Sequence, residues 1–173
     1  LSVPKPAWMA EDVAMLYDMA HRFMSEEIAP RYDEFEKNEM VDRKAWEQAG
    51  AAGLLCASMP EQYGGSGGTF AHESAIIEAM AHVGFDGFGI GLHNSIVALY
   101  ILHYGSEEQK QKWLPKMATG EMIGATPMTE PGAASDLKGV EPRTERTGTQ
   151  DSIKGSKSVT THRQQPQPII VVT

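Results

Sequence analysis

The sequence predicts a mainly α fold in which a helical domain is followed by an incomplete β-domain. Five stretches in the first 120 residues place apolar side chains at the spacing of an amphipathic helix. These stretches lie near 10–28, 43–53, 72–83, 88–104 and 106–119. After Gly120 the composition shifts to Thr, Gly, Lys, Arg, Gln and Pro, with only short apolar pieces. We therefore place a boundary near Met122: residues 1–121 form the helical domain, and residues 122–173 begin a β-domain that is too short to bury its own core and is degenerate after about residue 141.

The first two helices carry start and stop signals. Residues 10–28 present one apolar face, and Pro30 is predicted to end the helix because proline lacks the N–H that a helix interior needs. The next stretch, 43–53, follows Asp42, a residue type that caps helix N-termini, and closes at Gly53.

A glycine-rich corner separates these helices from the later ones. Residues 63–68 lack the Gly-Lys-Ser/Thr ending of a P-loop and the Gly-x-Gly-x-x-Gly order of a dinucleotide fold, so we interpret them as a tight turn.

The stretch at 88–104 is apolar nearly all round, which predicts a central helix. Its His93 and His103 are expected to be hydrogen-bonded core groups. Ser106 and Gln109 have the spacing of a capping box.

Composition and charge exclude several classes of function. The chain has 173 residues, 41% hydrophobic and 22% charged, as in ordinary globular proteins, and a formal net charge of -8. Because nucleic acids and anionic membranes bind clustered Lys and Arg, neither is an expected partner. The single cysteine, Cys56, is expected to be a small buried residue and cannot form an internal disulfide. The six histidines lack metal-ligand spacing, so no metal site is predicted.

The lengths of the apolar runs and the single cysteine indicate where the protein is located. No apolar run is long enough to span a membrane, and residues 1–30 lack a basic-then-apolar secretory signal. The lone cysteine favours a reducing compartment. We therefore expect a location in the bacterial cytoplasm, or in the mitochondrial matrix if a leader was removed.

A polar, turn-rich segment at 128–136 follows a short apolar run at 122–127. A proline and a glycine inside the segment favour a turn that crowds hydroxyl, carboxylate and backbone N–H groups together. Such a loop can cradle a phosphate or the edge of a heterocycle. The alternative is an ordinary connector in which Ser135 or Asp136 caps a neighbouring element.

Several motifs stand in a fixed order along the chain. They are the segments 60–68, 103–110, 113–115 and 120–125, followed by Met-Thr-Glu-Pro at 128–131. In this order and spacing they resemble the N-terminal part of the acyl-CoA dehydrogenases, from about Arg22 to Val140 and nearest in pattern to the long-chain type. In this family an N-terminal helical domain, a middle β-domain and a C-terminal four-helix bundle surround FAD and the acyl-CoA. The resemblance implies that this chain is the first domain and the start of the second.

The resemblance also implies which residues meet the cofactor. The implied FAD-binding residues are Thr126, Met128, Thr129, Ser135, Val159 and Thr161. The first three would line the isoalloxazine ring, and Ser135 would approach both the FAD pyrophosphate and the CoA part of the substrate. The chain departs from the family pattern at Ala134, where glycine is usual, and at Val159, where an aromatic residue packs on the flavin. In that second flavin segment, only Lys157 and Thr161 clearly match.

The implied reaction is the α,β-desaturation of acyl-CoA thioesters, in which a carboxylate removes the α-proton and the β-hydrogen leaves as hydride. The family's base is a glutamate beyond the β-domain. No residue of this chain matches it, so no catalytic residue is assigned, Glu130 is interpreted as structural, and the chain alone is expected to be inactive. The implied partners are acyl-CoA, an electron-transfer flavoprotein or similar acceptor, and copies of the same chain in a dimer or tetramer.

Two alternatives stay open. A non-enzymatic or degenerate relative would keep the helical domain for association. A flavin-dependent oxidase or monooxygenase of the same fold would share the helical half and differ mainly in its access for oxygen.

Overall fold

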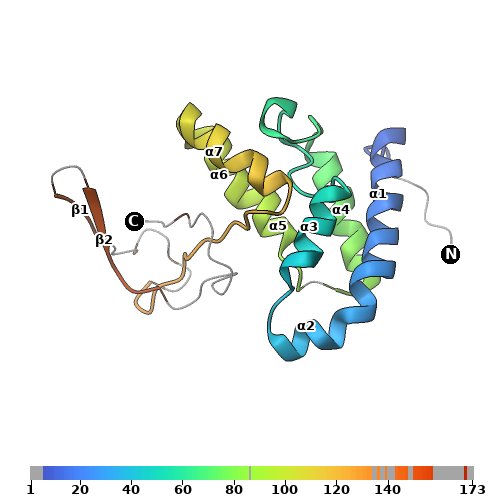
Figure 1. Cartoon of the computed structure of the whole chain (residues 1–173), viewed down its shortest axis with the longest axis horizontal. Helices are drawn as coiled ribbons and strands as arrows, with labels where there is room; N and C mark the ends of the chain where they lie inside the picture. The colour runs from blue at the N-terminus through green and yellow to red at the C-terminus, as the bar shows by residue number, and fades with distance from the viewer. Residues whose placement is uncertain are drawn as a thin grey trace.

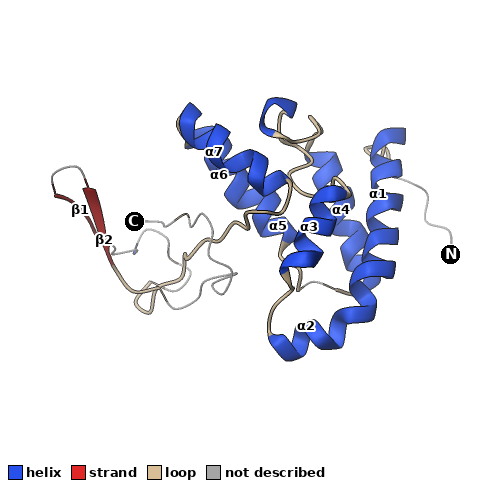
Figure 2. Cartoon of the chain, viewed as in Figure 1, coloured by secondary structure: helices blue, strands red, loops and turns tan. Residues whose placement is uncertain are grey.

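Helices make up most of the described structure, which confirms the predicted mainly α fold (Figures 1 and 2). The computed structural model describes residues 6–85, 87–133, 136, 139, 143–147, 150–157 and 170. The α-helices are α1 (Glu11–Phe23), α2 (Tyr32–Asn38), α3 (Arg43–Ala51), α4 (Phe70–Val83), α5 (Ile90–Leu92), α6 (Leu99–Tyr104) and α7 (Glu107–Ala118). The π-helical segments are η1 (Met24–Ile28) and η4 (His93–Ala98), and the 3-10 segments are η2 (Ala29–Arg31) and η3 (Glu61–Tyr63). Within these residues no helix is long and apolar enough to cross a membrane.

Helices α1 and α4 pack side by side and run in the same direction (Figure 1). Near the start of both helices, His72 Nε2 lies 3.2 Å from Asp12 Oδ2. Further along, the Tyr17 hydroxyl lies 2.7 Å from His82 Nδ1. These two contacts fix the register of the pair.

Two hydrophobic clusters form the core. The larger cluster lies among α1, η1, α3 and α4 around the fully buried Trp46, whose ring meets Phe88 edge-on with centroids 4.9 Å apart. The smaller cluster joins η4, α6, α7 and the corner after α3. It contains Cys56, Met59, Tyr63, Val97, Ala98, Ile101, Leu114, Met117 and Ala118. The prediction of a central helix over 88–104 is right for one face only, because Ile96, Tyr100 and Tyr104 are exposed.

The first helical stretch, α1 with η1, ends at Ile28, next to Pro30 as predicted, but the chain does not become a loop there because η2 and α2 follow. Pro30 lies in the first turn of the 3-10 segment η2, where backbone N–H groups have no intrahelical partner and proline is tolerated. Helix α2 then follows and ends where Glu39 takes a left-handed φ of 51°. Its short apolar face, of which only Phe35 is buried, is too weak a periodic signal to predict a helix.

Two predicted helix caps are confirmed. The Ala45 N–H donates to Asp42 Oδ1 at 2.9 Å at the start of α3. At the start of α7, the Gln109 N–H donates to Ser106 Oγ at 3.2 Å, and the Ser106 N–H donates to Gln109 Oε1 at 2.8 Å. These bonds satisfy backbone donors that the first helical turn leaves without partners.

Strands β1 (Arg143–Thr147) and β2 (Gln150–Lys154) form an antiparallel hairpin that stands apart from the helices (Figure 1). The register pairs Arg143 with Lys154. Of the short apolar run at 169–172, the structure describes Ile170, whose N–H donates to the Ala125 carbonyl at 3.0 Å. The described β-structure is thus small.

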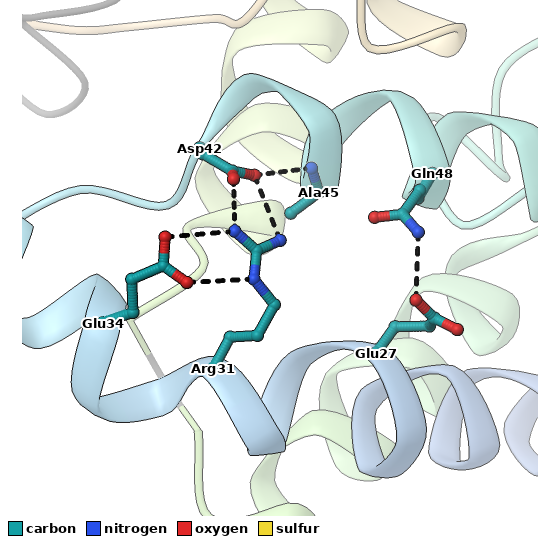
Figure 3. Close-up of polar contacts among 6 residues, drawn as sticks. All are labelled: Glu27, Arg31, Glu34, Asp42, Ala45 and Gln48. Carbon is teal, nitrogen blue, oxygen red and sulfur yellow. Dashed lines mark hydrogen bonds and ion pairs between the residues drawn. The ribbon is translucent and has the colours of Figure 1, made fainter.

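A charged cluster joins η2 to the start of α3 (Figure 3). The Arg31 guanidinium pairs with the Asp42 carboxylate and donates from Nε to Glu34 Oε2 at 3.3 Å. Burial alone would raise the pKa of Asp42, but hydrogen bonds from Arg31 and from the Ala45 N–H outweigh burial and lower this pKa below its usual value. One carboxylate therefore serves both as helix cap and as ion-pair partner.

Replacing Asp42 separates these two roles. Asp42→Asn keeps a capping oxygen and loses the charge, whereas Asp42→Ala loses both. We expect Asp42→Ala to lower the free energy of unfolding by about 1–2 kcal/mol and Asp42→Asn by less than about 1 kcal/mol. Because folding lowers the pKa, the charge-dependent part is present at neutral pH, begins to shrink below about pH 4 and is lost as the pH passes the folded-state value. Urea unfolding at pH 7 and along a series to pH 2 measures both effects, and equal stability of parent and Asp42→Ala at pH 7 would contradict the capping role.

Candidate functional site

The candidate loop leaves α7 through a glycine. Gly120 has a positive φ of 77°, and the Met122 N–H donates to a carbonyl of the last turn of α7 at 2.9 Å. Residues 123–127 are then buried. Gly124 packs so closely against η4 that a Cβ there would lie 2.6 Å from Val97 Cγ1, so a larger residue would push the loop off the helix.

His93, which is fully buried, joins the loop to the helices. Its Nδ1 accepts from the Gly124 N–H at 3.0 Å, so Nε2 carries the proton and donates to the Met117 carbonyl oxygen at 3.1 Å. The ring also packs against Trp46, with centroids 5.2 Å apart. The prediction that His93 is a hydrogen-bonded core group is confirmed, while His103 is exposed and that part of the prediction was wrong.

Asn94, the next residue along η4, holds the corner that follows α3. Its Oδ1 accepts from the Cys56 N–H at 2.9 Å, and its Nδ2 donates to the Leu54 carbonyl at 3.0 Å and to Glu73 Oε2 at 2.8 Å. The other Glu73 oxygen accepts from the Ser58 N–H at 2.8 Å. This network fixes the corner on α4 and η4.

The sequence carried a signal for Glu73 that the helical prediction did not use. Glu73 precedes Ile76, Ile77 and Met80 by three, four and seven residues, so it lies on the apolar face of α4. A carboxylate on a buried face needs hydrogen-bond donors, because an unpaired buried charge is very costly. Asn94 gave no comparable signal, because the spacing of its neighbours is that of an ordinary buried helix.

Cys56 has no role as a nucleophile in this setting. Burial, and to a lesser extent the Glu73 carboxylate, raises the pKa of the Cys56 thiol well above its usual value, so the thiol stays protonated. Its backbone φ of 55° lies in the left-handed region, and the Asn94 side chain holds its N–H there. The prediction of a small buried residue is confirmed.

The polar part of the loop is fastened to the segment that follows β2. Lys157 Nζ lies 2.8 Å from Glu130 Oε1, and it donates to the Met128 carbonyl oxygen at 3.3 Å. The side chains of Lys157 and Glu130 are 11% and 8% exposed. Glu130 therefore makes the structural contact that the sequence predicted for it, with a partner that the sequence did not identify.

The structure describes three of the six predicted cofactor-binding residues. Thr126 is buried, and its hydroxyl donates to the Ile170 carbonyl at 3.0 Å. Met128 and Thr129 are half-buried and follow it directly. Ser135, Val159 and Thr161 lie outside the described residues.

A helical domain whose last helix leads into an anchored polar loop is the architecture of the first part of an acyl-CoA dehydrogenase. The chain belongs to this family: residues 10–121 match the family described as acyl-CoA dehydrogenase, N-terminal domain. The sequence resemblance is thereby confirmed.

Individual relatives agree with this assignment. The long-chain specific acyl-CoA dehydrogenase of Mus musculus, a mitochondrial protein by its name, is 40% identical over 90% of this chain and 36% of its own length. The crystal structure of an acyl-CoA dehydrogenase from Geobacillus kaustophilus superposes with a TM-score of 0.91 at 39% identity, over 96% of this chain and 44% of that one. An acyl-CoA dehydrogenase from Bacillus anthracis, solved in complex with FAD, gives 0.87 at 33% identity, over 98% of this chain and 30% of that one. This chain thus spans about a third of the curated relative's length.

Replacing His93 tests the junction between helices and loop. His93→Leu removes the acceptor of the Gly124 N–H and the donor of the Met117 carbonyl, and an unmet buried polar group costs about 1–3 kcal/mol. We therefore expect the free energy of unfolding to fall by at least about 2 kcal/mol and the Gly124 amide to exchange its hydrogen faster. The matched control is His103→Leu, which changes an exposed histidine of the same helical stretch. If both variants match the parent in urea unfolding, His93 does not hold the junction.

Proposed function

We propose that this chain supplies the flavin-loop part of an FAD-dependent acyl-CoA dehydrogenase, an enzyme that desaturates acyl-CoA thioesters between the α and β carbons. The family membership of residues 10–121 supports the proposal, as does a relative solved with FAD. The name of the mouse relative favours long-chain acyl groups. In this proposal the helical domain and the loop bind and orient FAD. The whole activity belongs to a protein of the relatives' length.

A set of half-buried donors on the loop carries the proposal. Among the described residues, no hydrogen bond engages the N–H of Met128, the N–H of Thr129 or the Thr129 hydroxyl, although the backbone on either side is anchored. Half-buried donors that the protein does not engage can donate to a ligand that presents acceptors. The isoalloxazine ring of FAD has acceptor nitrogens and carbonyl oxygens along its edge, which fits these groups.

Thr129 and the backbone of Met128 are therefore the residues that would hold FAD. Thr126 stays a proposed flavin-lining residue, and its hydroxyl donates to the Ile170 carbonyl oxygen, which holds this part of the loop in place. FAD, when bound, supplies a hydride acceptor, which no amino-acid side chain can replace.

The removal of the substrate's α-proton is not assigned to this chain. Glu130 is the single carboxylate between residues 122 and 133, and it is buried beside Lys157. A general base must lie within hydrogen-bond reach of the proton that it removes. A carboxylate already paired with a buried ammonium group is poorly suited to that task.

The proposal extends to partners and location. Acyl-CoA would be the substrate, with Ser135 near its CoA part, and an electron-transfer flavoprotein or a similar acceptor would reoxidise the flavin. We also propose a homo-oligomer, dimer or tetramer, in the bacterial cytoplasm. Analytical ultracentrifugation of the purified chain, with and without FAD, tests the oligomer.

The Thr129 hydroxyl gives the sharpest test of cofactor binding. Thr129→Val keeps the shape of the side chain and removes the hydroxyl, so we expect FAD affinity to fall by about 1–3 kcal/mol. Flavin retained after gel filtration, measured by absorbance, reports the loss. Thr119→Val is the matched control, because Thr119 is exposed at the end of α7. Equal flavin content in all three proteins would remove Thr129 from the site.

A turnover assay tests the missing base. We expect the 173-residue chain with FAD, an acyl-CoA series and a dye acceptor to show negligible reduction of the dye, because general-base catalysis supplies about 10²–10⁴-fold in rate. Dye reduction that Glu130→Gln abolishes would show that Glu130 is the base after all. Failure to take up FAD at all would favour a non-enzymatic role of the helical domain in association.

A further inference from the structure

We infer that Lys157 is a positioning residue for the proposed flavin loop: by holding the Met128 carbonyl oxygen and the Glu130 carboxylate together, it orients the Thr129 N–H toward the ligand. The inference rests on the proposed function, because the ligand in question is the flavin edge. It assigns to Lys157 a role that acts through the loop backbone, without contact to the ligand.

The Lys157 ammonium group lies between two acceptors of the loop. Lys157 Nζ reaches both Glu130 Oε1 at 2.8 Å and the Met128 carbonyl oxygen at 3.3 Å from a segment that follows β2, nearly thirty residues further along the chain. The ammonium group therefore donates a hydrogen bond to the Met128 carbonyl oxygen and forms an ion pair with the Glu130 carboxylate. Both ionic side chains are about nine-tenths buried. A buried position fixes the contact more firmly than an exposed one would, because water competes less for it.

The Met128 carbonyl and the Thr129 N–H belong to the same peptide group, and the described backbone contains no cis peptide bond. In a planar trans peptide the C=O and N–H bonds point in opposite directions. Because Lys157 holds the carbonyl on its own side, the Thr129 N–H must point away from Lys157.

A flip of the Met128–Thr129 peptide unit would exchange the positions of its carbonyl and its N–H. If the peptide turned over, a carbonyl oxygen would replace the N–H donor on the side away from Lys157. A carbonyl there would face the acceptor atoms of the flavin edge and repel them, so binding would be lost rather than merely weakened at one bond. Lys157 opposes this flip with a hydrogen bond from a charged donor, which is roughly twice as strong as one between neutral groups.

Glu130 stabilises the buried Lys157 ammonium group. A buried ammonium group is costly to desolvate, and a neighbouring carboxylate offsets that cost. Glu130 therefore offsets the cost of burying the Lys157 ammonium group beside the Met128 carbonyl. Removing either partner alone would leave the other as an uncompensated buried charge, which destabilises strongly.

The experiment therefore removes both charges together. The test variant is Lys157→Met with Glu130→Gln in the full 173-residue chain. The control variant is Lys116→Met with Glu121→Gln, which removes an exposed ion pair of similar length, 3.0 Å, at the end of α7. Three quantities are measured on each protein: the urea midpoint, the dissociation constant for FAD from flavin fluorescence, and the ¹H–¹⁵N resonance of Thr129 in the FAD-free protein.

We expect the test variant to keep the urea midpoint of the parent, to bind FAD about tenfold more weakly and to show a broadened or split Thr129 resonance, because the peptide unit now samples two orientations. The control variant should match the parent in all three. A lowered urea midpoint in the test variant calls for Lys157→Met with Glu130→Leu, since apolar side chains often replace a buried ion pair without loss of stability.

Two results separate this inference from the proposed function. If the parent binds FAD and the test variant matches it in affinity and in the Thr129 resonance, the positioning role is overturned and the proposed function stands. If the parent does not bind FAD, the proposed function fails, and the Thr129 resonance alone decides: a single sharp resonance in the test variant overturns the positioning role, and a split one supports it.

Discussion

The arrangement of the helices and the loop depends on the two hydrogen bonds that the buried His93 ring makes with backbone groups. His93 joins the Met117 carbonyl at the end of α7 to the Gly124 N–H at the start of the loop, and Asn94 beside it fastens the corner after α3. Two consecutive residues of η4 therefore satisfy buried backbone groups from separate segments. These positions tolerate few other side chains, because each lost bond would leave a buried group unsatisfied. The π-helical turn at this point agrees with the tendency of such turns to occur at functional sites.

The loop is held from two sides before any ligand arrives. From the helical side His93 fixes Gly124, and from the C-terminal part of the chain Ile170 and Lys157 fix Thr126 and the Met128 carbonyl. The loop donors that no hydrogen bond engages among the described residues lie between these fixed points. Such preorganisation favours binding, since less conformational freedom is lost when a ligand is bound.

Much of this fold could be predicted from the sequence, and the failures have physical causes. Apolar periodicity and caps such as Asp42 predicted the long helices, because those signals are local. Helix α2 was missed because its apolar face is short, and Glu73 was missed because periodicity records where polar residues stand and not which partners they meet. The loop residues came from resemblance to a family, which identified Thr126 but could not show that its hydroxyl is taken by Ile170. Lys157 matched the family pattern, yet its pairing with Glu130 depends on a contact between distant segments, which spacing along the chain does not encode.

The reactive side chains of the corner after α3 and of the loop are all engaged in structural contacts or kept protonated by burial. The His93 ring is committed at both nitrogens, the Glu73 carboxylate accepts from the Ser58 N–H and from Asn94, and Glu130 is paired with Lys157. Burial keeps the Cys56 thiol protonated. A proton taken up or released by His93, Glu73 or Glu130 would break a bond that holds the corner or the loop in place. Acid–base chemistry at these positions would loosen the loop. We therefore propose that this part of the protein holds and orients a flavin, and that the proton transfer is supplied from another element.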